Sequence, residues 1–488
     1  MRLFLCSLTL ILGCLPSVHA RQAPLSSDAL NERFTELIDQ GYAGEAFWGI
    51  SVRDEEGNEL FSKNGNKLFR PASNVKLFTS AAVLNRFGVD YTFKTIVYGA
   101  GALKDGVWMG DIIIRGAGDP SINGVGYDDD RWYVFKQFVH QLKKAGIQSV
   151  EGKLIANLSL FDDRYYPKGW DVDDLSFYYG VQTSPLSFNS NTVDLIVEAN
   201  GEVGEVPDIR WFPDNTDYVT FINEQQITGP GTGYEEYYHR NLGTNTINLG
   251  STMPVGYVEK ESLSIHDPGL FFVDSFAKFL SKNGISVSDG IGTNYSERDW
   301  QSLQTLAVHT SAPVSELLIW ANKESDNLYF EMFTKAMAAF QKGSGASTEQ
   351  GIQMIKAEVA SLGLDTSLVH LQDGSGLSGG NLTTPSNFTL LLSEMTHHPS
   401  FSAFYKSLPV SQMDGTLAWR FKRSEVGNRF SGKTGFMGGV RTLSGYLDTA
   451  SGKRLAVSIM TNNFVSELKE VDRIHEQWIE YLYTYYGN

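Results

Sequence analysis

Residues 70–76 read Arg-Pro-Ala-Ser-Asn-Val-Lys, so that Ser73 stands three residues before Lys76. The window that follows contains Ser80-Ala81-Ala82-Val83-Leu84 and has the apolar spacing of a helix, which ends near Phe87-Gly88. We expect a helix to open at Ser73, which places the serine and lysine side chains one turn apart on the same face. A serine hydroxyl becomes a good nucleophile when a nearby base takes its proton, and a partly neutral amine is such a base. The stretch therefore predicts a nucleophile, Ser73, and its base, Lys76.

A second motif, Ser325-Asp326-Asn327, follows Ser73 by 252 residues (325 − 73), in a region of helical periodicity over residues 314–338. We expect it near a break between two helices. The Ser325 hydroxyl is suited to relay a proton toward a leaving amine, and the Asn327 amide to hydrogen-bond a substrate backbone.

The third motif, Lys433-Thr434-Gly435, is suited to bind a free carboxylate through its first two side chains. If Lys433 lies near Lys76, each ammonium group would lower the proton affinity of the other. An oxyanion hole needs two backbone N–H groups, and those of Ser73 and Phe436 are the best candidates. The three motifs together predict acyl transfer through a serine without a histidine base.

Each motif is common by chance. Ser-x-x-Lys recurs at Ser275 and at Ser466, but Ser466 is followed by neither of the other motifs. Ser275 lies in a β-rich stretch, in a segment whose apolar stripe indicates packing. Order and spacing, rather than any single motif, favour Ser73.

The predicted secondary structure changes in character twice along the chain. Residues 46–52 and 59–62 predict a β-hairpin, residues 439–448 and 454–461 predict two antiparallel strands, and residues 466–485 predict a closing helix. Between residues 91 and 304 the chain has short β-like runs and many turns. We expect one discontinuous catalytic domain, residues 21–90 and 305–488, interrupted by a β-rich insertion, residues 91–304, of two subdomains.

These motifs resemble those of the penicillin-recognising serine enzymes, and more closely those of the class C low-molecular-mass penicillin-binding proteins, which are D-alanyl-D-alanine carboxypeptidase/endopeptidases. The resemblance covers nearly the whole chain after residue 20, and the long gap between the first two motifs is typical of that class. Related class A β-lactamases have a short gap. The segments that carry the resemblance are residues 71–76, 116–120, 323–329, 373–378, 414–417 and 433–435.

The resemblance implies an α+β fold: a transpeptidase/β-lactamase-like domain, with an antiparallel sheet flanked by helices, that carries one or two inserted β-rich domains. It also implies that an aspartate of the insertion reaches the substrate side chain. Asp174 is the matching position, and Tyr179 would line the same pocket. For Asp174, a solvated carboxylate in an acidic turn is the alternative interpretation.

Three positions depart from the family pattern. Many members have an arginine where this chain has Gly379, so a cation that could bind a substrate carboxylate is absent there. Phe436 stands where Ser or Thr usually follows the third motif, and Gly438 where some relatives have Gln. We hypothesise from Gly379 that the pocket tolerates stem peptides without the carboxylate that an arginine would bind.

Two other motif matches predict different functions. Residues 427–434 fit the phosphate-binding P-loop pattern, but a polar stretch precedes them and a strand pattern follows, where a P-loop needs a strand and then a helix. Residues 376–380 fit the nucleophile elbow of α/β-hydrolases, but they lead to a loop before a helix beginning near Pro385. Both patterns are therefore better read as chance matches.

The first twenty residues predict a signal peptide cleaved after Ala20. Both cysteines, Cys6 and Cys14, lie inside it, which excludes cysteine catalysis from the mature chain. Lipidation at Cys14 is a less favoured alternative. The nine histidines show no zinc-peptidase spacing, and we expect neither a metal nor a cofactor.

The net charge is −16, with acidic and basic residues interspersed, and no apolar run after the signal has the length to span a bilayer. Nucleic acid is not an expected partner. We expect an exported, periplasmic-type D,D-carboxypeptidase/endopeptidase that acts on peptidoglycan stem peptides and is acylated by β-lactams. The alternatives are a β-lactamase or esterase on the same fold, or a weakly catalytic wall-binding protein.

Overall fold

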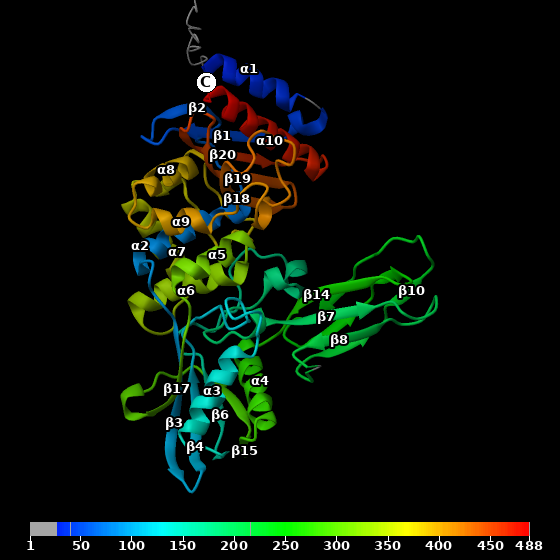
Figure 1. The fold of residues 1–488 in the computed structure, drawn as a ribbon, viewed down its shortest axis with the longest axis vertical. Coiled ribbons are helices and arrows are strands. Elements are labelled where there is room, and N and C mark those ends of the chain that lie inside the picture. Colours follow the sequence, from blue (N-terminus) through cyan, green and yellow to red (C-terminus); the bar gives the residue numbers. More distant parts are fainter. Residues whose placement is uncertain (1–26, 40, 215, 488) are drawn as a thin grey trace, which may run out of the picture.

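The computed structural model describes residues 27–39, 41–214 and 216–487. The predicted signal peptide and Cys14 lie outside these residues. Figure 1 shows an elongated molecule with a sheet at each end, a group of helices between them, and smaller sheets projecting to one side. Among the described residues, no helix has the length and apolar character required to cross a membrane.

The catalytic sheet has five antiparallel strands in the order β18-β19-β20-β1-β2. It joins the two ends of the chain, because its strands β1 and β2 come from the front and β18 to β20 from the back. The predicted hairpin and the two predicted later strands are confirmed. The strands are β1 (Phe47–Arg53), β2 (Glu59–Lys63), β18 (Phe430–Met437), β19 (Val440–Asp448) and β20 (Arg454–Asn462).

Helices cover both faces of this sheet. On one face α1 (Ser27–Ile38) and α10 (Leu468–Tyr485) bury Phe34 and Trp478 against Trp48 of β1 and other apolar strand residues. On the other face the second cluster includes Phe78, which stacks on Phe388 with ring centroids 4.6 Å apart. The helices of that second group are α2 (Val75–Phe87), α5 (Val314–Lys323), α6 (Asn327–Lys342), α7 (Thr348–Ser361), α8 (Pro385–Thr396) and α9 (Phe401–Ser407).

The inserted region is built around a second sheet, in the order β15-β5-β4-β3-β17, with β6 paired to β4 and β16 paired to β6. Three small sheets are formed by β14-β7-β8, β11-β12-β9 and β10-β13. The strands of the larger sheet are β3 (Lys94–Lys104), β4 (Val107–Arg115), β5 (Ser149–Glu151), β6 (Leu154–Asn157), β15 (Ser286–Val287), β16 (Ile291–Asn294) and β17 (Gln304–Thr310). The other strands are β7 (Thr192–Glu198), β8 (Asp208–Phe212), β9 (Thr220–Asn223), β10 (Gln226–Thr228), β11 (Tyr238–Arg240), β12 (Thr246–Leu249), β13 (Thr252–Pro254) and β14 (Val258–Ser264).

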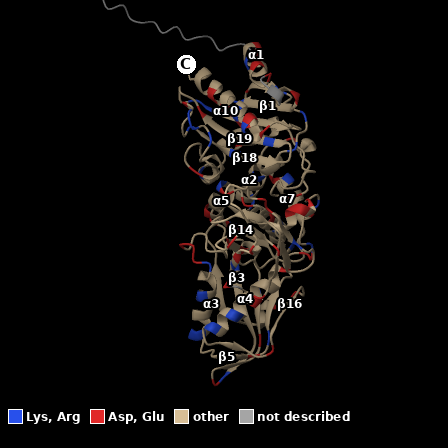
Figure 2. Ribbon diagram, turned by 90° about the vertical axis from the view of Figure 1, so that its right-hand side faces the viewer, with Lys and Arg blue, Asp and Glu red and all other residues tan. Residues whose placement is uncertain are grey.

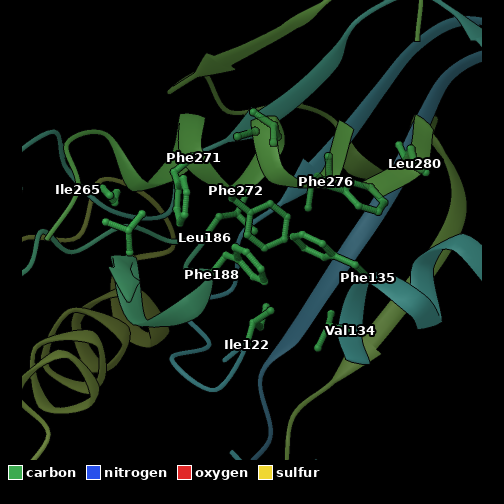
Figure 3. Packing of buried hydrophobic residues seen from close by; sticks show 14 of the residues in the cluster. Ile122, Val134, Phe135, Leu186, Phe188, Ile265, Phe271, Phe272, Phe276 and Leu280 are labelled. Carbon is green, nitrogen blue, oxygen red and sulfur yellow. The ribbon is translucent and has the colours of Figure 1, made fainter. Parts of the chain in front are cut away.

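Two helices lie within this β-rich region, α3 (Tyr133–Lys144) and α4 (Pro268–Lys282). Figure 3 shows Phe135 of α3 packed beside Phe272 and Phe276 of α4. Ser275 is buried in α4, so its Ser-x-x-Lys match belongs to a packing segment as expected, although that segment is a helix, which was not predicted.

The predicted boundary between residues 304 and 305 is wrong. It cuts β17, which pairs with β3 and so belongs to the sheet of the insertion. The chain returns to the catalytic domain after Thr310. Figure 2 shows acidic and basic residues along the whole length of the ribbon, in keeping with their interspersed order in the sequence.

Candidate active site

Ser73 lies in a short 3-10 turn, η2 (Ala72–Asn74), that leads directly into α2. The predicted helix opening is therefore confirmed. Lys76, in the first turn of α2, is fully buried, and its Nζ lies 3.0 Å from the Ser73 Oγ. The amine also donates to the Asn327 Oδ1 (2.6 Å) and to the Ser375 carbonyl (2.7 Å). Three oxygen partners thus hold Nζ against the serine hydroxyl.

The second motif lies at the junction of α5 and α6, as predicted. Asp326 caps α6 by accepting a hydrogen bond from the Tyr329 N–H (3.2 Å), and Asn327 is the first residue of the helix. The Asn327 Nδ2 donates to the Tyr179 carbonyl of the insertion (2.8 Å), which fixes the orientation of the amide. Its oxygen therefore faces Lys76, and the inserted region takes part in building the site.

The third motif lies on β18, which is an edge strand of the catalytic sheet. The buried Lys433 Nζ donates to the Ser325 Oγ (2.8 Å) and so links the third motif to the second. Gly435 is needed because a Cβ at this position would lie 2.2 Å from the Thr442 Oγ1 and 2.8 Å from the Pro71 carbonyl oxygen. The close approach of β18 to η2 thus depends on this glycine.

Strand alternation orients the Phe436 N–H. The Gly432 N–H donates to Pro409 and the Phe430 carbonyl accepts from Ser411, both at 2.9 Å, so these two residues turn their peptide groups away from β19. Residues two and four positions further on have the same orientation in a regular strand. The Phe436 N–H therefore faces the open edge of the sheet, on the side of η2, although its side chain is 59% exposed.

Burial lowers the pKa of Lys76 to about 8, and the carboxylates of Asp373, Glu331 and Asp326 oppose this shift. Burial also lowers the pKa of Lys433 well below its usual range, with further lowering by Lys76 and Arg441. The lowering of one lysine pKa by the other is thus found for Lys433, whereas the pKa of Lys76 is lowered by burial.

Glu331 is a residue that the sequence interpretation missed. It lies one turn after Asn327 on α6, fully buried, and its Oε1 accepts from the N–H groups of Gly374 (3.0 Å) and Ser375 (2.8 Å). It thereby holds Ser375, the residue whose carbonyl binds Lys76. The four-residue spacing from Asn327, on the same helix face, is the signal that could have identified it.

Asp373 anchors the same loop. Its carboxylate accepts from the N–H groups of Gly376 (2.8 Å) and Ser378 (2.6 Å) and from the Trp170 Nε1 of the insertion (2.9 Å). Ser378, the serine of the apparent nucleophile elbow, is buried and donates to Gln372, so it has no role as an exposed nucleophile. The apparent P-loop runs into β18 rather than into a helix.

The three motifs meet at one cleft of about 880 Å³. Of the predicted residues, Ser73, Ser325, Asn327, Thr434, Phe436, Asp174 and Tyr179 line this cleft, as do the departures Gly379 and Gly438. Lys76, Lys433 and Gly435 lie behind that surface. Residues that sequence reasoning did not place there are Arg70, Gly169, Asp171, Tyr178, Glu324, Gly376, Leu377, Gly380, Thr416, Met437 and Arg441.

The wall from the insertion is acidic. Asp174 is in η3 (Val172–Ser176), and burial, followed by the nearby Asp171 and Asp173, raises the pKa of its carboxyl. Among the described residues, no group of three or more His, Cys, Asp or Glu side chains is arranged to hold a metal ion. The chemistry that this arrangement offers is nucleophilic attack by a serine whose base is a buried amine.

Known proteins resemble this chain over most of its length. The D-Ala-D-Ala carboxypeptidase 3 (S13) family matches residues 30–482. A D-alanyl-D-alanine carboxypeptidase of Actinomadura sp. (strain R39) is 30% identical over 469 residues, which cover 92% of this chain and 85% of the relative. The D-alanyl-D-alanine carboxypeptidase DacB of Haemophilus influenzae is 25% identical over 426 residues, 85% of each chain.

Solved structures agree on the fold. The crystal structure of penicillin binding protein 4 (dacB) from Haemophilus influenzae has a TM-score of 0.80 at 22% identity and covers 93% of this chain and 99% of its own. A predatory peptidoglycan endopeptidase from Bdellovibrio bacteriovorus has a TM-score of 0.50 at 14% identity, with 90% of this chain and 92% of its own covered. The predicted α+β, penicillin-recognising fold is confirmed. The chain belongs to the D-Ala-D-Ala carboxypeptidase 3 (S13) family and is a serine-type carboxypeptidase of the class C low-molecular-mass penicillin-binding proteins.

Proposed function

We propose that the protein is an exported D,D-carboxypeptidase and D,D-endopeptidase that cleaves D-Ala-terminated peptidoglycan stem peptides, or their cross-links, through an acyl-enzyme on Ser73. The observation that carries this proposal is the 3.0 Å contact between the Ser73 Oγ and the amine of Lys76, at the cleft where all three motifs meet. The signal-peptide pattern of residues 1–20 supports export.

In the acylation step, the neutral Lys76 amine takes the Ser73 proton while Oγ attacks the carbonyl carbon of the penultimate D-Ala. The N–H groups of Ser73 and Phe436 stabilise the oxyanion that forms. Asn327 holds the base on one side, and its own orientation comes from Tyr179. Lys76 has a lowered pKa, so a useful share of the protein carries a neutral base near neutral pH.

In the second half of the step, the peptide C–N bond breaks and the departing amine needs a proton. The Ser325 Oγ, hydrogen-bonded to Lys433, is placed to deliver it. Thr434 is the member of the third motif that reaches the cleft, so its hydroxyl binds the terminal carboxylate, with the buried Lys433 amine behind it. Water then hydrolyses the Ser73 ester and frees the shortened peptide.

The same chemistry supports β-lactams as covalent inhibitors. Opening of a β-lactam ring leaves the amine tethered to the acyl group, so it cannot diffuse away and make room for water. We expect a long-lived penicilloyl-enzyme. Asp174 and Tyr179 would bind the side chain of the substrate on the wall from the insertion.

Product analysis tests this function directly. The purified protein is incubated with a synthetic stem pentapeptide and, separately, with cross-linked peptidoglycan fragments, and the products are weighed by mass spectrometry. Loss of one terminal D-Ala shows carboxypeptidase activity, and separation of two linked peptides shows endopeptidase activity. Ser73→Ala should abolish both. Products that persist in this variant would contradict the assignment of Ser73.

A further inference from the structure

An arginine that precedes the nucleophile lines the catalytic cleft. The backbone of Arg70 is held from both sides by one side chain, because its N–H donates to the Asn462 Oδ1 (2.8 Å) and its carbonyl accepts from the Asn462 Nδ2 (3.1 Å). Its Nη2 donates to the Asn463 Oδ1 (3.0 Å). The guanidinium is therefore positioned at the cleft rather than free to sample solvent.

The charge of Arg70 is not neutralised by the protein. Within residues 27–39, 41–214 and 216–487 its side chain makes that one hydrogen bond and no ion pair. Arg441, the other arginine of the cleft, differs: both ends of its guanidinium fork bind Asp472 (2.6 and 3.0 Å). A guanidinium has five N–H donors, so Arg70 retains several for a ligand. A carboxylate is the ligand that this fork fits best.

The position of Arg70 indicates which carboxylate it would meet. The Asn463 N–H donates to the Gly439 carbonyl (2.7 Å), so the guanidinium lies at the turn between β18 and β19. Met437 is the last residue of β18 and leads into this turn. Thr434, which binds the terminal carboxylate in the proposed reaction, is three residues earlier on the strand. At about 3.3 Å per residue, Thr434 and Met437 are about 10 Å apart. If Thr434 binds the carboxylate of the leaving D-Ala, that carboxylate lies away from the end of β18 at which Arg70 lies, and the guanidinium is left for the part of the substrate that precedes the scissile bond.

The space for such a group is open on this side. Gly379, where related enzymes carry an arginine, lines the same cleft, and a Cβ built there meets no atom within 4 Å. A Cβ at Gly438 likewise meets no atom within 4 Å. Position 379 thus supplies no cation to the cleft, whereas Arg70, three residues before Ser73, does.

We propose that Arg70 is a specificity-determining residue that binds a free carboxylate on the third-residue side chain of the stem peptide, and so replaces the arginine missing at position 379. This inference rests on the proposed function. It reverses the hypothesis drawn from Gly379, because the pocket then prefers carboxylated over amidated stem peptides. The acidic wall at Asp174 would take the amine of the same side chain.

Two synthetic stem pentapeptides test the proposal. They differ only in their third residue, a diamino diacid whose side-chain carboxylate is free in one and a primary amide in the other. The readout is kcat/KM for D-Ala release from each. A hydrogen-bonded charge pair gives a preference of about tenfold or more for the free carboxylate. Arg70→Gln should reduce that preference to near one, mainly through KM, and Arg70→Lys should retain part of it.

A second test moves the arginine from position 70 to position 379. In the Arg70→Gln background, Gly379→Arg should restore the preference for the free carboxylate. Arg53→Gln is the matched control, because Arg53 is on β1 and contacts Gly57 and Glu59 outside the cleft. An unchanged preference in folded Arg70→Gln protein would overturn the proposal. If the unaltered protein releases no D-Ala from either peptide and takes no penicillin label, the proposed function fails instead.

Discussion

The pH dependence of acylation follows from the burial of Lys76. With its pKa at about 8, the amine is neutral in about 9% of molecules at pH 7, whereas a lysine at its ordinary pKa of 10.5 would be neutral in about 0.03%. Burial therefore increases the population of the competent base about 300-fold at pH 7. A lowered lysine pKa gains neutral amine as pH rises, so acylation should rise with pH and level off above the pKa.

Stopped-flow measurement of acylation by a fluorescent penicillin gives this profile between pH 6 and pH 9.5. The second-order rate constant should rise about fivefold from pH 7 to pH 8 and less than twofold from pH 8 to pH 9, as the amine approaches full deprotonation. Lys76→Arg provides the control, since a guanidinium stays protonated in this range and should leave only a slow background. A tenfold rise between pH 8 and pH 9 would refute the reasoning, because it would show a lysine with an ordinary pKa.

Three further predictions concern other parts of the site. Glu331→Ala removes the acceptor for the Gly374 and Ser375 N–H groups and should slow acylation about tenfold or more. Glu331→Gln keeps an acceptor oxygen and should recover most of the rate, but it removes a carboxylate that raises the pKa of Lys76, so the pH midpoint of acylation should shift downward. A loss of rate in Glu331→Gln equal to that in Glu331→Ala, or an unchanged midpoint, contradicts the positioning role. Gly435→Ala should lower the free energy of unfolding by about 1–3 kcal/mol in urea titrations, because its Cβ would overlap the Thr442 Oγ1, and Gly438→Ala, with open space around it, should be close to neutral. Asp174→Asn should lower kcat/KM on stem peptides with a free third-residue amine more than it lowers penicillin acylation; equal losses would indicate a structural role in the turn.

The catalytic core was predictable because its signals are local. The helix that begins after Ser73, the break at Ser325 between two helices and the strands after Lys433 each follow from spacing within a dozen residues. Motif order then indicated which serine to choose. Ser275, the rival, is buried in α4, a helix whose Phe272 and Phe276 belong to the apolar core of the insertion.

What the sequence could not supply are contacts between residues far apart in the chain. Nothing near Asn327 shows that the Tyr179 carbonyl, 148 residues away, orients its amide. Nothing around Arg70 shows that residues 462 and 463 place it at the cleft. The helix α3 was overlooked for a different reason. Its buried residues Val134, Phe135, Phe138 and Leu142 have helical spacing, but turns and short strands on both sides hid it.

The central claim is that Ser73 carries the acyl group. Mass spectrometry of the protein after incubation with benzylpenicillin, followed by proteolysis and peptide mapping, tests it most directly. The account predicts one penicilloyl group per molecule, on the peptide that contains Ser73, and no adduct in Ser73→Ala. An adduct on any other residue, or labelling that persists in Ser73→Ala, would contradict it.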